Sequence, residues 1–144
     1  MPVYHFKKSD STSFSAIVAD STSDSLHVPN DPLAYAVQLN VSAAATDAGD
    51  ILQVYVQSSY DNTNWHDVGA FNQVLGNGGA KVRTMKWSVG SITTPEEVKQ
   101  DAAVAAGTVR NGPTGPFLRL KYTVTDAGAD NASFTFTALV QAYE

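Results

Sequence analysis

Several stretches of the chain alternate between apolar and polar residues, at 34–43, 51–59, 118–124 and 134–141. A repeat of two residues is typical of a β-strand with one face turned to a core, so each stretch is predicted to be a strand. A weaker alternation over 80–89 predicts a further strand. The side chains expected to face the core are Tyr35, Val37, Leu39, Val41, Leu52, Val54, Val56, Met85, Trp87, Val89, Leu118, Leu120, Tyr122, Val124, Phe134, Phe136, Ala138 and Val140.

The segments between these strands consist of residues that form tight turns. Clusters rich in Asp, Asn, Gly and Thr stand at 47–50, 61–64, 76–79 and 126–131. A further strand region over 65–75 is interrupted at Gly69, where a β-bulge is predicted. About eight short strands with turns at fairly even spacing are therefore expected. This pattern predicts an all-β domain, an antiparallel β-sandwich of the jelly-roll kind.

The first 24 residues differ in composition, because two Ser/Thr/Asp clusters surround a short apolar piece, Phe14 to Ala19. Such clusters favour turns and local side-chain-to-backbone hydrogen bonds. Two interpretations stay open: a mobile N-terminal arm with one edge strand that reaches a neighbour, or a loop-strand-loop segment of the sandwich. In the first, Phe14 binds a partner. The expected organisation is an arm over 1–24 and a single sandwich domain over 25–144.

One segment departs from the β pattern. Thr94 is a suitable N-cap, a proline follows at the first helical position, and Glu97 completes a capping box. A short helix over 95–106 is therefore predicted, and its narrow stripe of small side chains, which includes Val98, indicates packing on the sheet edge or on a neighbouring subunit. The helix and the Gly- and Pro-rich run after it form an insertion over 90–116.

The order of strands and turns also carries a family resemblance. The relevant motifs are QSS at 57–59, DNTNW at 61–65, DVGAF at 67–71, LRLKYTV at 118–124 and ASFTFTALVQA at 132–142. Residues 50–144 thereby resemble small β-sandwich accessory proteins of tailed-phage virions, of the head decoration or minor capsid type. The resemblance implies a virion protein that binds the major capsid protein lattice and stabilises the shell, with a homotrimer as the expected oligomer.

Composition and charge exclude several kinds of function. The net charge is −5 and 16% of residues are charged, with no basic cluster longer than Lys7-Lys8, so a nucleic-acid partner is not expected. No apolar run approaches the roughly 20 residues of a membrane helix, and no secretion signal is visible. We therefore expect a protein made in the cytoplasm, and the resemblance implies a phage host and use in the virion. The lack of cysteine excludes disulfides and cysteine nucleophiles.

Neither a catalytic nor a metal site is predicted. No pair among the three histidines has metal-ligand spacing, and no G-x-S-x-G elbow precedes a helix. Most aspartates stand in turns, where turn formation explains them, although a calcium site built from Asp47, Asp50 or Asp61 stays open as an alternative. We expect no cofactor and no enzymatic activity.

The aromatic residues are the remaining candidates for a binding site. An exposed platform able to hold a sugar ring would consist of Tyr55, Tyr60, Trp65, Phe71 and Trp87. The alternative is that both tryptophans fill the core. Tyr55 shares its face of the strand with two glutamines, so it is expected to point outward and to be free for a partner.

The partner contacts expected from the sequence are Phe14, Tyr55, Tyr60, Trp65 and Val98. Outward positions filled by Gln, Thr, Ser, Asn and Ala favour contact between subunits, because few charges are desolvated there. Two functions other than capsid binding stay open. One is a carbohydrate-binding or adhesin-like module, and the other is a component of the phage tail or neck.

Overall fold

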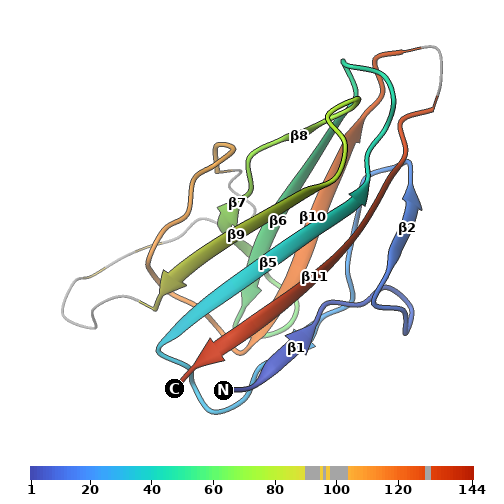
Figure 1. Cartoon of the computed structure of the whole chain (residues 1–144). Helices are drawn as coiled ribbons and strands as arrows, with labels where there is room; N and C mark the ends of the chain where they lie inside the picture. The colour runs from blue at the N-terminus through green and yellow to red at the C-terminus, as the bar shows by residue number, and fades with distance from the viewer. Residues whose placement is uncertain (90–94, 96, 98–103, 129–130) are drawn as a thin grey trace.

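The computed structural model describes residues 1–89, 95, 97, 104–128 and 131–144, and these residues form an all-β domain without a helix (Figure 1). Its strands are β1 (Val3–His5), β2 (Phe14–Ile17), β3 (Ser21–Thr22), β4 (Leu26–His27), β5 (Ala34–Ala43), β6 (Ile51–Ser59), β7 (His66–Ala70), β8 (Val74–Leu75), β9 (Lys81–Ser88), β10 (Phe117–Thr125) and β11 (Phe134–Tyr143).

The strands form two antiparallel sheets that pack face to face (Figure 1). The first sheet has the order β1-β11-β5-β9, with β2 also on β11, and the second has the order β3-β10-β6-β7, with β4 on β10 and β8 on β6. Thus β1 and β2 both pair with β11, β3 and β4 both pair with β10, and β7 and β8 both pair with β6. When each of these pairs counts as one strand, the eleven strands become eight, in the order of a jelly roll. The predicted fold class is confirmed.

The predicted inward side chains build the core between the sheets. All of them are buried except Val89 and Val124, which are partly buried at strand ends. Phe14 stacks on Phe136 with 4.8 Å between ring centroids, and Tyr122 meets both rings edge-on. Because Tyr122 comes from the second sheet, this aromatic cluster joins the two sheets.

Residues 1–24 are part of this sandwich. β1 pairs with the C-terminal part of β11, β2 pairs with its beginning, and β3 pairs with β10. Phe6 and Phe14 are fully buried, and Ile17 is 7% exposed. The segment therefore has the loop-strand-loop arrangement and does not extend away as an arm, because its few apolar residues complete the core along the edge of the first sheet.

The outward face of β6 is not solvated, which corrects the expectation for this strand. Gln53 is 5% exposed and Gln57 is fully buried, although both alternate with the core residues. β6 lies between β10 and β7, and the Trp65 and Arg119 side chains and the backbone at Val104 cover it from outside. Strand alternation predicts which side chains share a face, but not whether a second segment covers that face.

The predicted bulge is confirmed beside Gly69. Asp67 and Gly69 lie opposite consecutive residues of β6, so Val68 is the extra residue of β7. A Cβ atom at Gly69 would lie 3.2 Å from the carbonyl oxygen of Thr108, closer than most such contacts. Glycine at this position lets residues 108 and 109 of the insertion approach β7.

The helix predicted over 95–106 lies mostly outside the described residues, and Val98 is among those not described. The described members of this range, residues 95, 97 and 104–106, are not helical. The chain then runs antiparallel to β7, where the Gly107 amide donates to the Ala70 carbonyl at 3.0 Å and the Ala70 amide donates to the Thr108 carbonyl at 2.9 Å. Residues 107–109 of the insertion thereby extend the edge of the second sheet.

Candidate functional site

The two outer faces of the sandwich differ in what covers them. The outward side chains of the first sheet are all exposed or half-buried, and we call this surface the open face. Its members on the paired strands are Val3, His5, Ala34, Ala36, Gln38, Asn40, Ser42, Val82, Thr84, Lys86, Ser88, Thr135, Thr137, Leu139, Gln141 and Tyr143. Within this set Lys86 is the single Lys, Arg, Asp or Glu side chain. The open face is therefore broad and almost uncharged.

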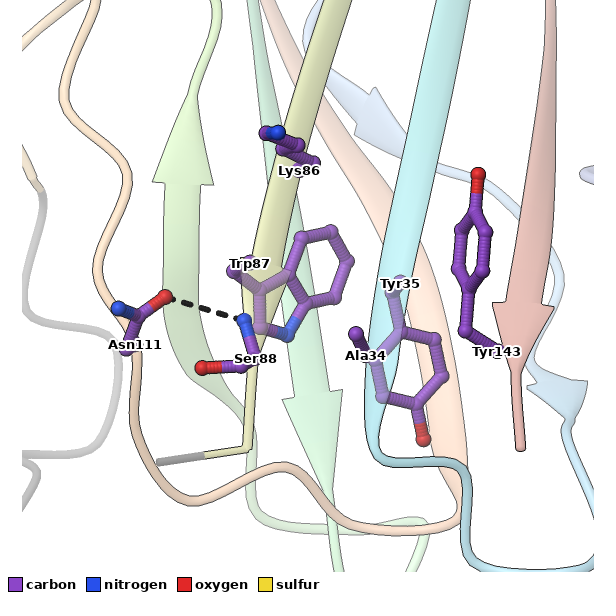
Figure 2. A pocket seen from close by; sticks show the side chains of 7 residues that line it. All are labelled: Ala34, Tyr35, Lys86, Trp87, Ser88, Asn111 and Tyr143. Atoms are coloured by element: carbon purple, nitrogen blue, oxygen red, sulfur yellow. Dashed lines mark hydrogen bonds between the residues drawn. The ribbon is translucent and has the colours of Figure 1, made fainter. Parts of the chain in front are cut away.

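A hollow of about 460 Å³ lies at one end of the open face, where β5 begins and β9 and β11 end (Figure 2). Ala34 stands in register between Ser88 and Tyr143, and its small side chain leaves space between them. Asn111 closes the side beyond β9, where its Oδ1 accepts a hydrogen bond from the Ser88 amide at 3.0 Å (Figure 2). We call this space the alanine hollow.

Tyr35 and Trp87 lie behind the alanine hollow as a stacked pair, with 5.0 Å between ring centroids and 15° between ring planes. Trp87 is 3% exposed, and its Nε1 donates a hydrogen bond to Thr114 Oγ1 at 3.1 Å. This tryptophan therefore belongs to the core and holds the chain that leads to β10.

A second hollow, of about 380 Å³, borders the same tyrosine at this end of the sandwich. Asp31, Leu33, Tyr35, Tyr60 and Val89 are among its lining residues, and we call it the tyrosine hollow. Leu33 is 64% exposed and Tyr60 is 61% exposed, so both are accessible at this hollow. The two hollows share Tyr35, so both open at the same end of the molecule.

Tyr60 is held outward by the turn that follows β6. The Asp61 carboxylate accepts hydrogen bonds from the Asn64 amide at 2.8 Å, from Asn64 Nδ2 at 2.6 Å and from the Thr63 amide at 2.9 Å. These bonds, those from Asn64 first, hold the pKa of the Asp61 carboxyl well below its ordinary value. The predicted turn is confirmed, and it places Tyr60 at the rim of the tyrosine hollow.

Of the partner-binding residues predicted from the sequence, only Tyr60 is exposed. Phe14 is fully buried in the core, and Tyr55 is half-buried on the covered face. Trp65 is 6% exposed, with the guanidinium carbon of Arg119 4.3 Å from its ring centroid. Val98 lies outside the described residues. Core packing encloses Phe14, and a cation–π contact with Arg119 covers Trp65, so neither ring is presented to solvent.

The predicted sugar platform does not form either. Trp65, Phe71 and Trp87 are all buried, and Tyr60 alone among its members is exposed. These rings are buried in two different places. Phe71 and Trp87 belong to the core between the sheets, whereas Trp65 packs against the Arg119 side chain on the outer side of the second sheet. A flat stacking surface needs rings that are exposed side by side, and these rings are not.

A buried polar network on the covered face was not predicted. Asp67 is 2% exposed, and its carboxylate accepts hydrogen bonds from Gln57 Nε2 at 2.8 Å and from the Val104 amide at 3.2 Å. Arg119 Nε donates to Gln57 Oε1 at 2.8 Å. The hairpin register places Gln57 opposite Asp67, and this pairing is the signal in the sequence that points to the network.

Comparison with known proteins adds no relative. No protein-family model matches the chain, and no curated protein matches its sequence. The case for any function therefore rests on the residues and their geometry.

The described residues hold no group of three or more His, Cys, Asp or Glu side chains arranged to hold a metal ion. Asp50, one of the aspartates of the open calcium alternative, is 1% exposed, and its Oδ1 accepts a hydrogen bond from the Ala127 amide at 3.0 Å. Asp50 thus joins the β5–β6 turn to the β10–β11 turn. Within the same residues no helix is long and apolar enough to cross a membrane.

Replacing Asp67 by alanine is expected to lower the free energy of unfolding by about 1–3 kcal/mol, because the buried Gln57 amide and the Val104 amide lose their acceptor. Asp67→Asn, which keeps one acceptor oxygen, should cost less. Urea denaturation measures both, with the exposed Gln73→Ala as control. A loss for Asp67→Ala no larger than that of the control would show that the network adds nothing to stability.

Tyr35 is expected to ionise later than an ordinary tyrosine. Burial first, and then the nearby Asp31 carboxylate and Tyr60, raise its pKa from 10.0 to about 12. The pKa of Tyr35 is higher in the folded state than in the unfolded state. The contribution of its neutral phenol to the free energy of unfolding is therefore fully present below about pH 10 and is lost as the pH rises toward 12. Ultraviolet titration at the phenolate band should show a late component that becomes smaller in Tyr35→Phe. An unchanged titration curve in that variant would contradict the assignment.

Proposed function

We propose that this chain is a non-enzymatic structural protein of a tailed-phage particle, which attaches to the assembled capsid through its open face. The observation that supports this most is the difference between the two outer faces. The chain covers the outward side of β6 with its own residues, whereas the outward side chains of β1, β11, β5 and β9 are exposed or half-buried among the described residues.

The chemistry of the open face suits contact with another protein. Its glutamine, asparagine, serine and threonine side chains can exchange hydrogen bonds with water for bonds with a partner, and only Lys86 would bring a formal charge into the contact. An uncharged flat surface avoids the large desolvation cost of buried ions. Each contact is weak, so firm attachment follows when several copies engage neighbouring subunits at once.

The phage particle and the trimer come from the resemblance of residues 50–144 to decoration and minor capsid proteins. In the structure those motifs form the β6–β7 hairpin and the consecutive strands β10 and β11; β6, β10 and β11 lie inside their sheets, and β7 lies at the edge of the second sheet. They therefore act as scaffold, and the proposed contact lies on the surface that this scaffold presents.

The test places negative charge on the open face. Gln38→Glu combined with Thr137→Glu adds two carboxylates at exposed positions of β5 and β11 that are not directly opposite each other. Cosedimentation with capsids assembled without this protein should show saturable binding of the natural chain. The double variant should bind about tenfold more weakly or worse, since unpaired charges would be buried in the contact.

The matched control is Gln73→Glu, an exposed glutamine outside the open face. It should bind capsids like the natural chain, and circular dichroism should show that all variants are folded. Equal binding by the double variant and the control would show that the open face is not the contact. No binding of the natural chain to any assembled phage particle would overturn the proposed function itself.

A further inference from the structure

We propose that the tyrosine hollow binds a basic side chain, lysine or arginine, of a partner protein. This inference goes beyond capsid attachment and does not rest on it, because the tyrosine hollow lies at the end of the sandwich and its lining shares no residue with the open face. The argument rests on the charge, the aromatic rings and the rigidity of the lining.

The tyrosine hollow has one formal charge, and it is negative. Asp31 is the single acidic or basic side chain among the described lining residues. With no cation among the described lining residues, the Asp31 carboxylate attracts a positively charged group.

Two tyrosines complete the surroundings of such a cation. Tyr60 is 61% exposed and offers its ring to ammonium and guanidinium groups, whereas Tyr35 also lines the tyrosine hollow but is only 2% exposed. The Asp31 charge and Tyr60 also act on the Tyr35 phenol, which agrees with their closeness in this space. A carboxylate and an exposed aromatic ring in one hollow both attract a cationic side chain.

The remaining walls match the aliphatic part of a long basic side chain. Leu33 and Val89 are apolar, and Leu33 stands largely exposed at the rim. The Thr114 hydroxyl is already hydrogen-bonded to Trp87 Nε1 and to the Gly112 carbonyl. A sugar, whose several hydroxyl groups need several polar partners, fits this lining less well than a basic group on an apolar stem.

The segment that carries Asp31 is held in place without a ligand. Asn30 and Asp31 have φ angles of 72° and 45° between two prolines, a left-handed turn that these residue types tolerate. The Leu33 amide donates to the Tyr143 carbonyl at 2.7 Å, and the Val89 amide donates to the Leu33 carbonyl at 3.1 Å. These bonds fix the backbone two residues after Asp31, so little backbone freedom is lost there on binding, which favours affinity.

The test is a nuclear magnetic resonance titration of the full ¹⁵N-labelled chain with three capped amino acids. N-acetyl-lysine methylamide and N-acetyl-arginine methylamide carry the cation, and N-acetyl-norleucine methylamide has a similar apolar stem without charge. The cationic probes should shift the Asp31, Leu33 and Val89 amide signals with millimolar affinity, as a lone side chain allows. Norleucine methylamide should leave these signals unchanged.

Variants separate the two parts of the site. Asp31→Asn should weaken binding of both cationic probes about fivefold or more. Asparagine tolerates the positive φ of this position, so the backbone turn is kept. Tyr60→Ala should weaken binding similarly, whereas Tyr60→Phe keeps the ring and should keep the affinity. Asp126→Asn, at an exposed turn, is the matched control and should bind as the natural chain does.

The outcomes decide the proposal. Equal shifts with norleucine methylamide, or unchanged affinity in Asp31→Asn, would overturn it. So would tighter binding of methyl glucoside or N-acetylglucosamine than of either cationic probe, which would make the tyrosine hollow a sugar site. Capsid attachment is measured separately on the open-face variants, so failure of that function and failure of this inference are told apart.

Discussion

Deletion of residues 1–24 is expected to unfold the protein. The deleted segment contributes β1, β2 and β3 and carries Phe6, Phe14 and Ile17 into the core. Loss of a single buried phenylalanine side chain costs about 3–5 kcal/mol, and a whole domain of this kind has a stability of about 5–15 kcal/mol. Removing two such residues together with their strands therefore takes away most or all of that stability.

Far-ultraviolet circular dichroism and the spread of amide proton signals measure this effect. The truncated chain should lose the sheet spectrum and the dispersed signals of the full chain. A matched control, Thr12→Ala with Ser15→Ala, changes exposed residues of the same segment and should stay folded. A truncated chain that remains folded would support the arm interpretation instead, in which residues 1–24 bind a neighbour and leave the sandwich intact.

Phe136→Ala should destabilise the fold by about 3–5 kcal/mol, because it leaves a cavity in the middle of the aromatic cluster. Phe136 is fully buried and contacts both Phe14 and Tyr122. Its neighbour Thr137 lies on the open face and is exposed, so Thr137→Ala should change stability by less than about 0.5 kcal/mol.

Thr137 is a better control than Thr135, because Thr135 Oγ1 accepts a hydrogen bond from the Ala16 amide at 3.0 Å. Urea unfolding of both variants gives the comparison, with the slope of the transition as a check that the folded state stays compact. A larger loss for Thr137→Ala than for Phe136→Ala would mean that β11 is shifted by one residue and shows its other face to the core.

The strands, the turn at Asp61 and the bulge could be predicted from the sequence, because each depends on residues that are close together along the chain. The alternation in β5, β10 and β11 predicts the buried set, since successive side chains of a strand point to opposite faces. The Asp61 turn follows from residues that bond their own backbone, and the bulge follows from a glycine. Together these patterns were enough to predict a jelly-roll sandwich.

The candidate site depends on contacts that no local pattern contains. Asp31, Tyr35 and Tyr60 lie on two separate segments of the chain, and they meet because β5 begins where β6 ends, at the same end of the sandwich. Gln57 looked solvated because its strand alternates, yet Trp65, Arg119 and the returning chain bury it.

The same reason explains Phe14. Its short apolar piece between serine clusters fits an exposed arm and a buried edge strand equally well. In the structure it forms the edge strand, because β2 pairs with β11 and Phe14 stacks on Phe136. The sequence by itself determined the strands, the turns and the uncharged character of the open face. Only the tertiary structure decided which faces are covered and which distant residues share a hollow, because burial depends on what packs against a strand and not on the strand alone.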